Sequence, residues 1–554
     1  MIVTAVTFAP VQSFIHSSRK LRDLYGSSLL LSHLARGLYN GATRNLGVHA
    51  VISPADVNST RGVPNTLLIE GAYARADAEA ALLNAWRQVL GACRHYLEHL
   101  PHRDPGWFAQ AWNTQQWEAG WGGSWKACER HSWELFHGQG DTISAAETAL
   151  SHAKQRRAWE IPNWTGESST LSSAEAIVRP RMAEKHDPRL ADSTAHKEEA
   201  RQLLQLLRHP GNLGPAFAGE HEEISLSELV KRLVTYRQVA EKAFGTKTES
   251  LSAILPQRFD RVSARLTQGD KERPETIIWF MADGDRVGDH LRQLSESPSE
   301  IENRRSFSRK MRQWAAGLYR KVPDQMGRDR ATVVYAGGDD LFGALHETEP
   351  GERDLRREHL FDWLRIFPDL WKQNELTGIT ASMGLVWADS QVPQREALQH
   401  ARDAEAAAKA RGRDRFALRL LYAGGNHLQW TCPWTLLHPI LHHYRDREGR
   451  SNTTMSANAK PPRWRHLAED LLWLQERHAI GDAIHLGAPD AAAQATRSAK
   501  AEAVAMGLLQ AYFPGWDPPP SLEVGRRLDQ WLIDLGLVMA GLERWRDSPQ
   551  ERTP

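Results

Sequence analysis

A stretch of fifteen residues, from Ala331 to Leu345, limits the possible fold more than any other part of this sequence. It holds an apolar, β-branched run, then Gly337, Gly338, Asp339 and Asp340, then a second apolar run. Two apolar runs joined by a short turn with glycines predict a β-hairpin. The glycines leave room for a phosphate group to approach the backbone. The two carboxylates are hard oxygen ligands that suit Mg²⁺ or Mn²⁺.

A second acidic turn lies upstream of this hairpin. Residues Thr276 to Ala282 have the pattern of a buried strand, which opens into Asp283, Gly284 and Asp285. If this strand pairs beside the hairpin, Asp283 and Asp339 converge at the same edge of the sheet. They are then expected to hold two divalent ions against a nucleoside triphosphate, the arrangement for in-line attack of a hydroxyl on the α-phosphate.

Taken alone, a Gly-Gly-Asp-Asp (GGDD) sequence is also typical of a solvated hairpin turn. The second acidic turn favours the metal site, because two independent acidic turns at strand ends are harder to explain as surface loops.

Composition narrows the class of protein. A chain of 554 residues is long enough for three or four domains. Its 69 basic and 68 acidic residues give a net charge of +1. This balance excludes a free-standing nucleic-acid binder that depends on a basic field over its whole surface, and leaves room for a local basic face inside an assembly.

The cysteines and the apolar runs indicate the cellular setting. Cys93, Cys128 and Cys432 lie too far apart in sequence for a zinc site of the CxxC type. No zinc and no disulfide framework are expected, and a reducing cytoplasm is the natural location. No signal peptide and no apolar run of about 18 residues is present, so no membrane segment is expected.

The pattern of apolar residues predicts an α+β fold. A strand over Ile2–Phe8, two short strands over Val51–Pro54 and Gly62–Ile69, and a helix over Ala76–Leu97 suit a ferredoxin-like unit. Six tryptophans lie between residues 107 and 133, and the first five recur every four to five positions, which favours helical core packing over base stacking. Helical patterns dominate residues 151–270 and 426–554.

The order of strand, Asp-x-Asp turn, helix and GGDD hairpin resembles the Palm domain of GGDEF-type nucleotide cyclases. It resembles more closely the catalytic Palm of the large subunit of type III CRISPR effector complexes, of the Cmr (III-B) type. The segments Met281–Gly288 and Tyr335–Asp340 carry this resemblance, and Pro10–Ser28 is similar to the opening of that subunit's first Palm-like domain. The resemblance implies two ferredoxin-like Palm domains, each an antiparallel sheet with helices on one face, plus two helical domains. The expected limits are 1–150, 151–270, 271–425 and 426–554.

The resemblance also implies an activity. An enzyme of this family uses ATP and two Mg²⁺ or Mn²⁺ ions to make a 3′–5′-linked cyclic oligoadenylate when the guide RNA of the complex pairs with a foreign transcript. The expected partners are therefore the other subunits of a type III complex, the CRISPR guide RNA and the target RNA, in antiviral defence.

The residues expected to carry this activity follow from the motifs. Asp283, Asp339 and Asp340 are the candidate catalytic residues and, with the carbonyl of Gly284, the candidate metal ligands. The candidate nucleotide-binding residues are Gly337, Gly338, Asp285, Ser382 and Lys409. Lys409 stands near the end of an alanine-rich helix, where related cyclases have a lysine that meets the triphosphate, although a helix C-terminus favours a lysine in any case.

Two features depart from the family pattern. Serines and a threonine fill residues 167–173, where paired cysteines of a zinc-binding insert are expected, which indicates that the metal was lost. His186 and Asp187 run directly into Pro188 and read as a loop dipeptide, so a form without the N-terminal HD nuclease domain is expected.

A short basic segment, made of Arg19, Lys20 and Arg22, has two possible roles. It forms either a solvated helix face or a contact to a second nucleotide or to RNA phosphates. Three other functions also stay open at this point. The first is a catalytically silent scaffold subunit. The second is an enzyme that transfers AMP to another small molecule, and the third is a dinucleotide cyclase that uses GTP.

Overall fold

A computed structural model describes most of the chain. The described residues are 2–57 except 19, 61–102, 121–156, 167–182 except 173, 174 and 181, 193–245, 276–348, 355–452 except 377 and 390, 461–519 except 486, 487 and 489, and 526–544. The chain divides into two compact units. The first comprises 1–274, 288–321 and 332–338, and the second comprises 275–287, 322–331 and 339–554.

The first unit is built around a four-stranded sheet of order β2-β3-β1-β4. Its strands are β1 (Val3–Ala9), β2 (Val51–Ser53), β3 (Leu67–Glu70) and β4 (Glu134–Gly140). The strands pair antiparallel throughout. Counted along the chain, this is the 4-1-3-2 order of a ferredoxin-like unit. The fourth strand, β4, follows Trp133 and is absent from the sequence-based expectation.

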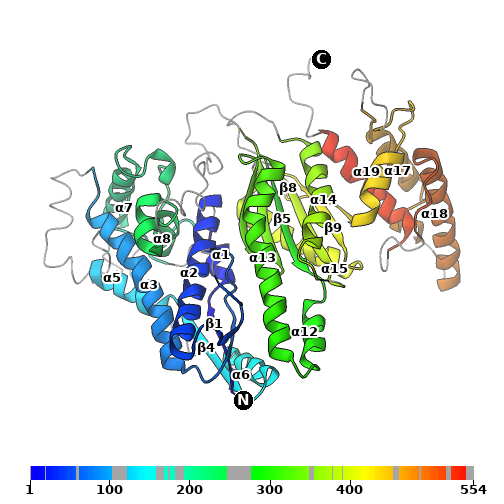
Figure 1. The fold of residues 1–554 in the computed structure, drawn as a ribbon. Coiled ribbons are helices and arrows are strands. Elements are labelled where there is room, and N and C mark those ends of the chain that lie inside the picture. The colour runs from blue at the N-terminus through cyan, green and yellow to red at the C-terminus, as the bar shows by residue number, and fades with distance from the viewer. Residues whose placement is uncertain are drawn as a thin grey trace. The chain divides into compact units, whose positions relative to one another are not determined.

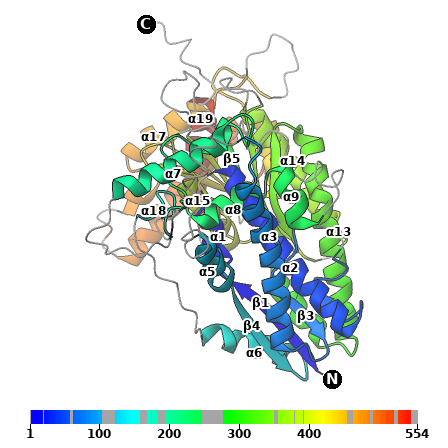
Figure 2. The ribbon, with the colours of Figure 1, turned by 90° about the vertical axis from the view of Figure 1, so that its left-hand side faces the viewer.

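The helices of the first unit pack on this sheet and on one another. They include α1 (Gln12–His16), α2 (Leu21–Leu46), α3 (Arg75–Glu98), α5 (Gly123–His131), α6 (Ile143–Gln155), α7 (Ser193–Arg208), α8 (Leu226–Leu233), α9 (Arg237–Phe244), α12 (Val287–Ser295) and most of α13 (Glu300–Met326). Figure 1 shows α2 and α3 side by side, and Figure 2 shows α6 beside β4. Trp121, Trp125 and Trp133 are buried, which confirms core packing for these three indoles.

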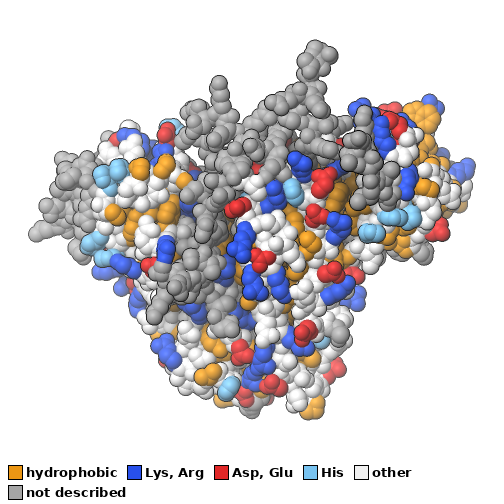
Figure 3. All heavy atoms as spheres, turned by 45° about the horizontal axis from the view of Figure 1, so that its top comes forward, with side chains coloured by type: hydrophobic (Ala, Val, Ile, Leu, Met, Phe, Trp, Pro, Cys, Tyr) orange, Lys and Arg blue, Asp and Glu red, His pale blue; other side chains and the backbone are white. Residues whose placement is uncertain are grey.

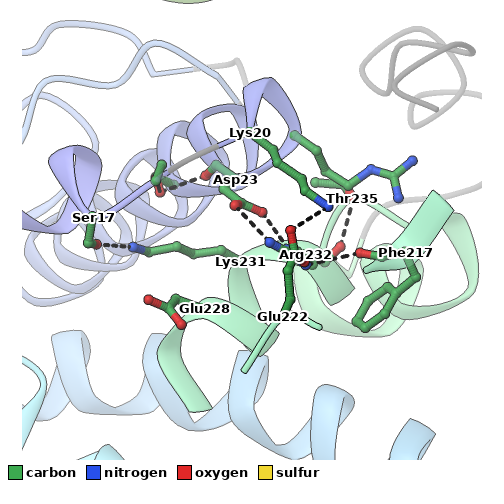
Figure 4. A network of polar contacts seen from close by, with 12 residues as sticks. Ser17, Lys20, Asp23, Phe217, Glu222, Glu228, Lys231, Arg232 and Thr235 are labelled. Carbon is green, nitrogen blue, oxygen red and sulfur yellow. Dashed lines mark hydrogen bonds and ion pairs between the residues drawn. The ribbon is translucent and has the colours of Figure 1, made fainter. Parts of the chain in front are cut away.

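A buried network of ion pairs joins α2 to α8 in the first unit (Figure 4). The guanidinium of Arg232 is fully buried and donates to Asp23 Oδ1 at 2.8 Å and to Glu222 Oε2 at 2.5 Å. Lys20 Nζ lies 2.8 Å from Glu222 Oε1. Although burial opposes it, the charges of Arg232 and Lys20 lower the pKa of Glu222 to about 2. The network holds the segment before α2 against α8.

The second unit holds most of a six-stranded sheet of order β10-β9-β8-β5-β7-β6. Its strands are β5 (Ile277–Gly284), β6 (Ala331–Gly337), β7 (Asp340–His346), β8 (Ala381–Ala388), β9 (Arg415–Leu421) and β10 (His427–Pro433). The four strands β8-β5-β7-β6 repeat the 4-1-3-2 order of the first sheet. The α+β class with two ferredoxin-like sheets is therefore confirmed.

Helices complete the second unit. They are α14 (Arg357–Lys372), α15 (Gln394–Ala410), α16 (Leu437–His443), α17 (Arg465–Glu476), α18 (Ala491–Tyr512) and α19 (Leu528–Arg544). Helix α15 connects the parallel strands β8 and β9 and packs on both of them. Strand β10 extends the sheet into a region expected to be helical, because residues 422–426 form a hairpin turn between β9 and β10.

Charged side chains of both signs are interspersed over the described surface drawn in Figure 3, as the small net charge predicts. Within the described ranges, no helix is both long enough and apolar enough to cross a membrane. Where cysteines of a zinc insert were expected, the buried hydroxyl of Ser169 donates to Glu228 Oε2 at 2.6 Å. The predictions for His186 and Asp187 lie outside the described residues.

Candidate active site

The register of the second sheet brings the two acidic turns together. Strand β5 pairs antiparallel with β7, and the last pair joins Ala282 to Leu341. Asp283, one residue further along, is therefore level with Asp340 at the start of β7. On its other side, Asp283 pairs with Ser382 of β8. The predicted convergence of the strand end and the hairpin turn is present within one sheet.

Gly284 lets the hairpin approach the end of β5 closely. A Cβ atom at this position would lie 2.9 Å from Asp339 Cβ and 2.7 Å from Val287 Cγ2. Neither neighbour can retreat easily, since Asp339 sits in a tight turn and Val287 begins α12. The glycine thus sets the separation between the backbone of Asp283–Gly284 and the side chain of Asp339.

Two aspartates of this cluster, Asp339 and Asp340, have raised pKa values. Burial and the neighbouring charge of Asp283 raise the pKa of Asp339 to about 6. The surrounding protein and the carboxylates of Asp283, Asp339 and Glu405 raise the pKa of Asp340 well above its usual value, although part of the Asp340 side chain reaches solvent. Carboxylates that raise one another's pKa are short of compensating positive charge.

Lys409 supplies one such charge. Its ammonium group contacts Asp283 Oδ2 and lies 2.8 Å from Glu405 Oε1, one helical turn earlier on α15. Burial opposes the charged form, but hydrogen bonds to Asp283 and Glu405 raise the pKa of Lys409. Glu405, which the sequence analysis did not single out, therefore belongs to the cluster. On the sequence alone, Glu405 and Lys409 look like an ordinary i,i+4 surface pair.

Asp285 is oriented differently from the other acids of the turn. Its carboxylate is buried and accepts hydrogen bonds from Ser382 Oγ and Thr380 Oγ1, each at 2.8 Å, and from the backbone N–H of Asp414 at 3.0 Å. The two predicted nucleotide-binding residues Asp285 and Ser382 thus bind each other. They tie the turn after β5 to the start of β8 and to the loop that follows α15.

The two glycines of the hairpin have different surroundings. Gly338 has a left-handed backbone with φ of 65°, and open space surrounds the position of a Cβ. Gly337 is buried, and a Cβ there would lie 2.8 Å from the carbonyl oxygen of Gly62. Gly338 therefore leaves its side of the turn open, as the approach of a phosphate group requires, whereas Gly337 makes room for the protein itself.

The donor set suits divalent cations. Among the residues that the structure describes, no three His, Cys, Asp or Glu side chains form a ready-made cation cage. Mg²⁺, however, is usually bound through one or two carboxylates together with substrate phosphates. The raised pKa values of Asp339 and Asp340 show that negative charge is crowded here, and the oxygens of Asp283 and Asp339 are of the kind that such a shared site uses.

The basic residues at the start of α2 have internal partners. Lys20 pairs with Glu222, and Arg22 donates to the hydroxyl of Tyr236. The structure therefore favours neither a solvated face nor an RNA contact for Lys20 and Arg22, because both side chains bind other parts of the first unit. Arg19 lies outside the described residues.

Comparisons with known proteins bear on both halves of the chain. Residues 277–417 match the family model described as Cas10/Cmr2, second palm domain, and residues 3–90 match the model described as CRISPR-associated protein Cmr2, N-terminal. None of the curated proteins matches the sequence.

One of three similar solved structures shows the same fold. A chain of a type III-B Cmr-beta complex in its apo state is 10% identical, with a TM-score of 0.55 over 98% of this chain and 82% of that chain. The Csm1-Csm4 cassette in complex with cA4 is 15% identical, with a TM-score of 0.43 over 97% of this chain and 70% of that chain. The cassette in complex with AMPPNP is 15% identical, with a TM-score of 0.43 over 98% and 69%. Only the first score is high enough to indicate a shared fold.

Proposed function

This chain belongs to the Cas10/Cmr2 family, and we propose that it is a nucleotidyltransferase that joins ATP into a cyclic oligoadenylate. The observation that carries the proposal is the meeting of Asp283, Asp339 and Asp340 around a single lysine, inside the matched second palm domain. A structural role alone gives no reason to gather acids that destabilise one another's charged forms.

Asp283 and Asp339 would hold Mg²⁺ or Mn²⁺, with the Gly284 carbonyl and Asp340 as further oxygen donors. Bound there with the phosphates of ATP, such ions lower the pKa of an attacking ribose hydroxyl and neutralise the charge that develops on the leaving pyrophosphate. The crowding of Asp340 by three other carboxylates supports this assignment, because a cation would relieve it.

Lys409 would bind the β- and γ-phosphates. Its ammonium group has three N–H donors. One oxygen of Glu405, on the preceding turn of α15, lies 2.8 Å from that group. When the charge of Asp283 is compensated by a cation, Lys409 can leave that carboxylate and still stay attached to Glu405. Asp285 and Ser382 would act on the nucleotide indirectly, by fixing the loop after α15.

The family also suggests where the enzyme works. We propose that the chain acts inside a type III CRISPR complex, with other protein subunits, a guide RNA and a target RNA as partners. Its small net charge supports binding of RNA as part of an assembly rather than alone.

The test is pyrophosphate release from ATP by the complex assembled with guide and target RNA. Asp339→Ala combined with Asp340→Ala should lower turnover on the order of 1,000-fold or more, because both carboxylates act on the phosphates. Size-exclusion chromatography should show an intact complex. Mass spectrometry then distinguishes a cyclic oligoadenylate from an AMP adduct of another small molecule. Wild-type turnover in the double variant would contradict the proposal.

A further inference from the structure

The loop at Arg61–Gly62, between β2 and β3, lies directly against β6, the strand that leads into the GGDD turn. Gly62 has a left-handed φ of 63°, and a Cβ at this position would lie 1.8 Å from the carbonyl oxygen of Ala336 and 3.2 Å from Tyr319 Oη. From the other side, a Cβ at Gly337 would lie 2.8 Å from the Gly62 carbonyl. These residues all belong to the first compact unit. The two backbones touch with no side chain between them.

Tyr319 of α13 binds the same backbone segment. Its hydroxyl accepts a hydrogen bond from the N–H of Ala336 at 2.9 Å. Among the strands that the structure describes, β6 is the last of its sheet, and none of them pairs with its outer side. The tyrosine hydroxyl satisfies an N–H at the end of that strand, two residues before Gly338.

Arg61 holds Tyr319 in turn. Its guanidinium carbon lies 4.0 Å from the centre of the Tyr319 ring, and its Nη1 donates to the hydroxyl of Tyr25 at 2.9 Å. Tyr25 is buried, and burial raises its pKa. Arg312, also on α13 and buried, donates to the Gly62 carbonyl at 2.9 Å. Two arginines and two tyrosines thus fix both sides of the contact between Gly62 and Ala336.

The reason for such an anchor lies in the turn itself. Gly337 and Gly338 have no side chains that neighbouring residues could hold, and glycine explores more backbone conformations than any other residue. Asp339 follows them directly and must be placed accurately if it is to act on a nucleotide. A fixed point at Ala336 restricts the turn where the sequence leaves it least restricted.

We propose that Tyr319 and Arg61 are positioning residues that fix the backbone at Ala336 and thereby the GGDD turn. The role for turnover rests on the proposed function, because the position of Asp339 matters to catalysis only if the turn acts on a nucleotide. The anchor joins the Arg61–Gly62 loop to Ala336, so a shift of this loop displaces Ala336 and the two glycines that follow it.

The anchor is tested first without any activity, by hydrogen–deuterium exchange of a peptide that covers residues 332–341 in the full-length chain. Tyr319→Phe keeps the ring and removes the acceptor of the Ala336 N–H, and exchange there should rise about fivefold. Arg61→Ala should have a similar effect. Arg61→Lys keeps a cation over the ring and should stay within about threefold of the wild type.

Arg309→Ala is the matched control. Arg309 lies on the same helix and pairs with Asp56 at 2.6 Å. Its loss should leave exchange at residues 332–341 unchanged. Unchanged exchange in Tyr319→Phe and Arg61→Ala, or an equal rise in Arg309→Ala, would overturn the anchor.

The consequence for turnover is measured in the RNA-bound complex. Tyr319→Phe should lower kcat about tenfold and change the KM for ATP less than about twofold, since the anchor acts on the geometry of the turn and not on ATP. Faster exchange with an unchanged kcat would overturn the positioning role. A wild-type complex that never turns over ATP would contradict the proposed function instead, and the exchange experiment would still decide the anchor.

Discussion

The two charged clusters of this protein differ in how their charges balance. In the first unit, Asp23 and Glu222 face Arg232 and Lys20, two acids against two bases. In the second unit, four acids (Asp283, Asp339, Asp340 and Glu405) surround Lys409, and among the described residues Arg402 adds one further positive charge near Glu405. The pKa values follow the balance. The pKa of Glu222 is lowered to about 2, and the pKa of Asp339 is raised to about 6.

The difference separates a structural network from a binding site. A balanced buried network is satisfied by the fold alone and loses stability when one partner is removed. A cluster with excess negative charge is satisfied only when a cation arrives from outside, which is typical of functional sites. Removing a charge should therefore have opposite effects on stability in the two clusters.

The largest expected effect on stability comes from the balanced cluster. Arg232→Ala leaves Asp23 and Glu222 buried without their shared partner and should lower the free energy of unfolding by about 3–5 kcal/mol. Arg75→Ala, which breaks an exposed i,i+4 pair with Glu79, should change it by less than about 0.5 kcal/mol. Urea unfolding of both variants measures the contrast. Equal small losses would mean that the network of Figure 4 does not stabilise the fold.

The second effect is a dependence on pH. The pKa of Glu222 is depressed in the folded state, from 4.5 to about 2. Its contribution is therefore complete above pH 4.5 and is lost as the pH falls towards 2, by at most about 3 kcal/mol. Glu222→Gln should remove this part of the acid sensitivity, which unfolding curves between pH 5 and pH 3 can measure. An unchanged pH dependence in the variant would contradict the assignment.

The smallest effect has the opposite sign and lies in the unbalanced cluster. Without divalent cations, Asp339→Asn relieves repulsion and should raise the free energy of unfolding by about 1 kcal/mol, a value reduced for solvent screening. Asp369→Asn, whose exposed carboxylate pairs with Lys372, is the control and should have no measurable effect. A loss of stability in Asp339→Asn would place Asp339 among the structural acids.

Much of the site could be predicted from the sequence, because its main parts are local. The strand before Asp283, the hairpin at Gly338 and the helix that ends near Lys409 follow from apolar patterns and turn chemistry. The register of β5 against β7 follows from the same pattern, because a slip of one residue would turn the apolar side chains to the other face of the sheet. The observed register places Asp283 beside Asp340.

What could not be predicted depends on tertiary contacts between distant segments. Glu405 looks like half of a surface pair until α15 is placed beside Asp340. Asp285 looks like a nucleotide-binding residue until Thr380 and Ser382 are seen to donate hydrogen bonds to it. Arg61 and Tyr319 lie 258 positions apart in the sequence (319 minus 61), and no local pattern connects them. The sequence analysis missed β4, which pairs with the distant strand β1, and β10, which pairs with the preceding strand β9, because the pairing partner defines each of them more than its own pattern does.

The central claim is that the excess negative charge around Asp339 is a site for divalent cations and a nucleotide. Crystals of the protein grown with Mn²⁺ and a non-hydrolysable ATP analogue test it most directly, through the anomalous scattering of manganese. We expect manganese within about 2.0–2.4 Å of carboxylate oxygens of Asp283 and Asp339, with the triphosphate beside Gly338 and Lys409. Manganese bound elsewhere, with Lys409 still on Asp283 and no nucleotide at the turn, would contradict it.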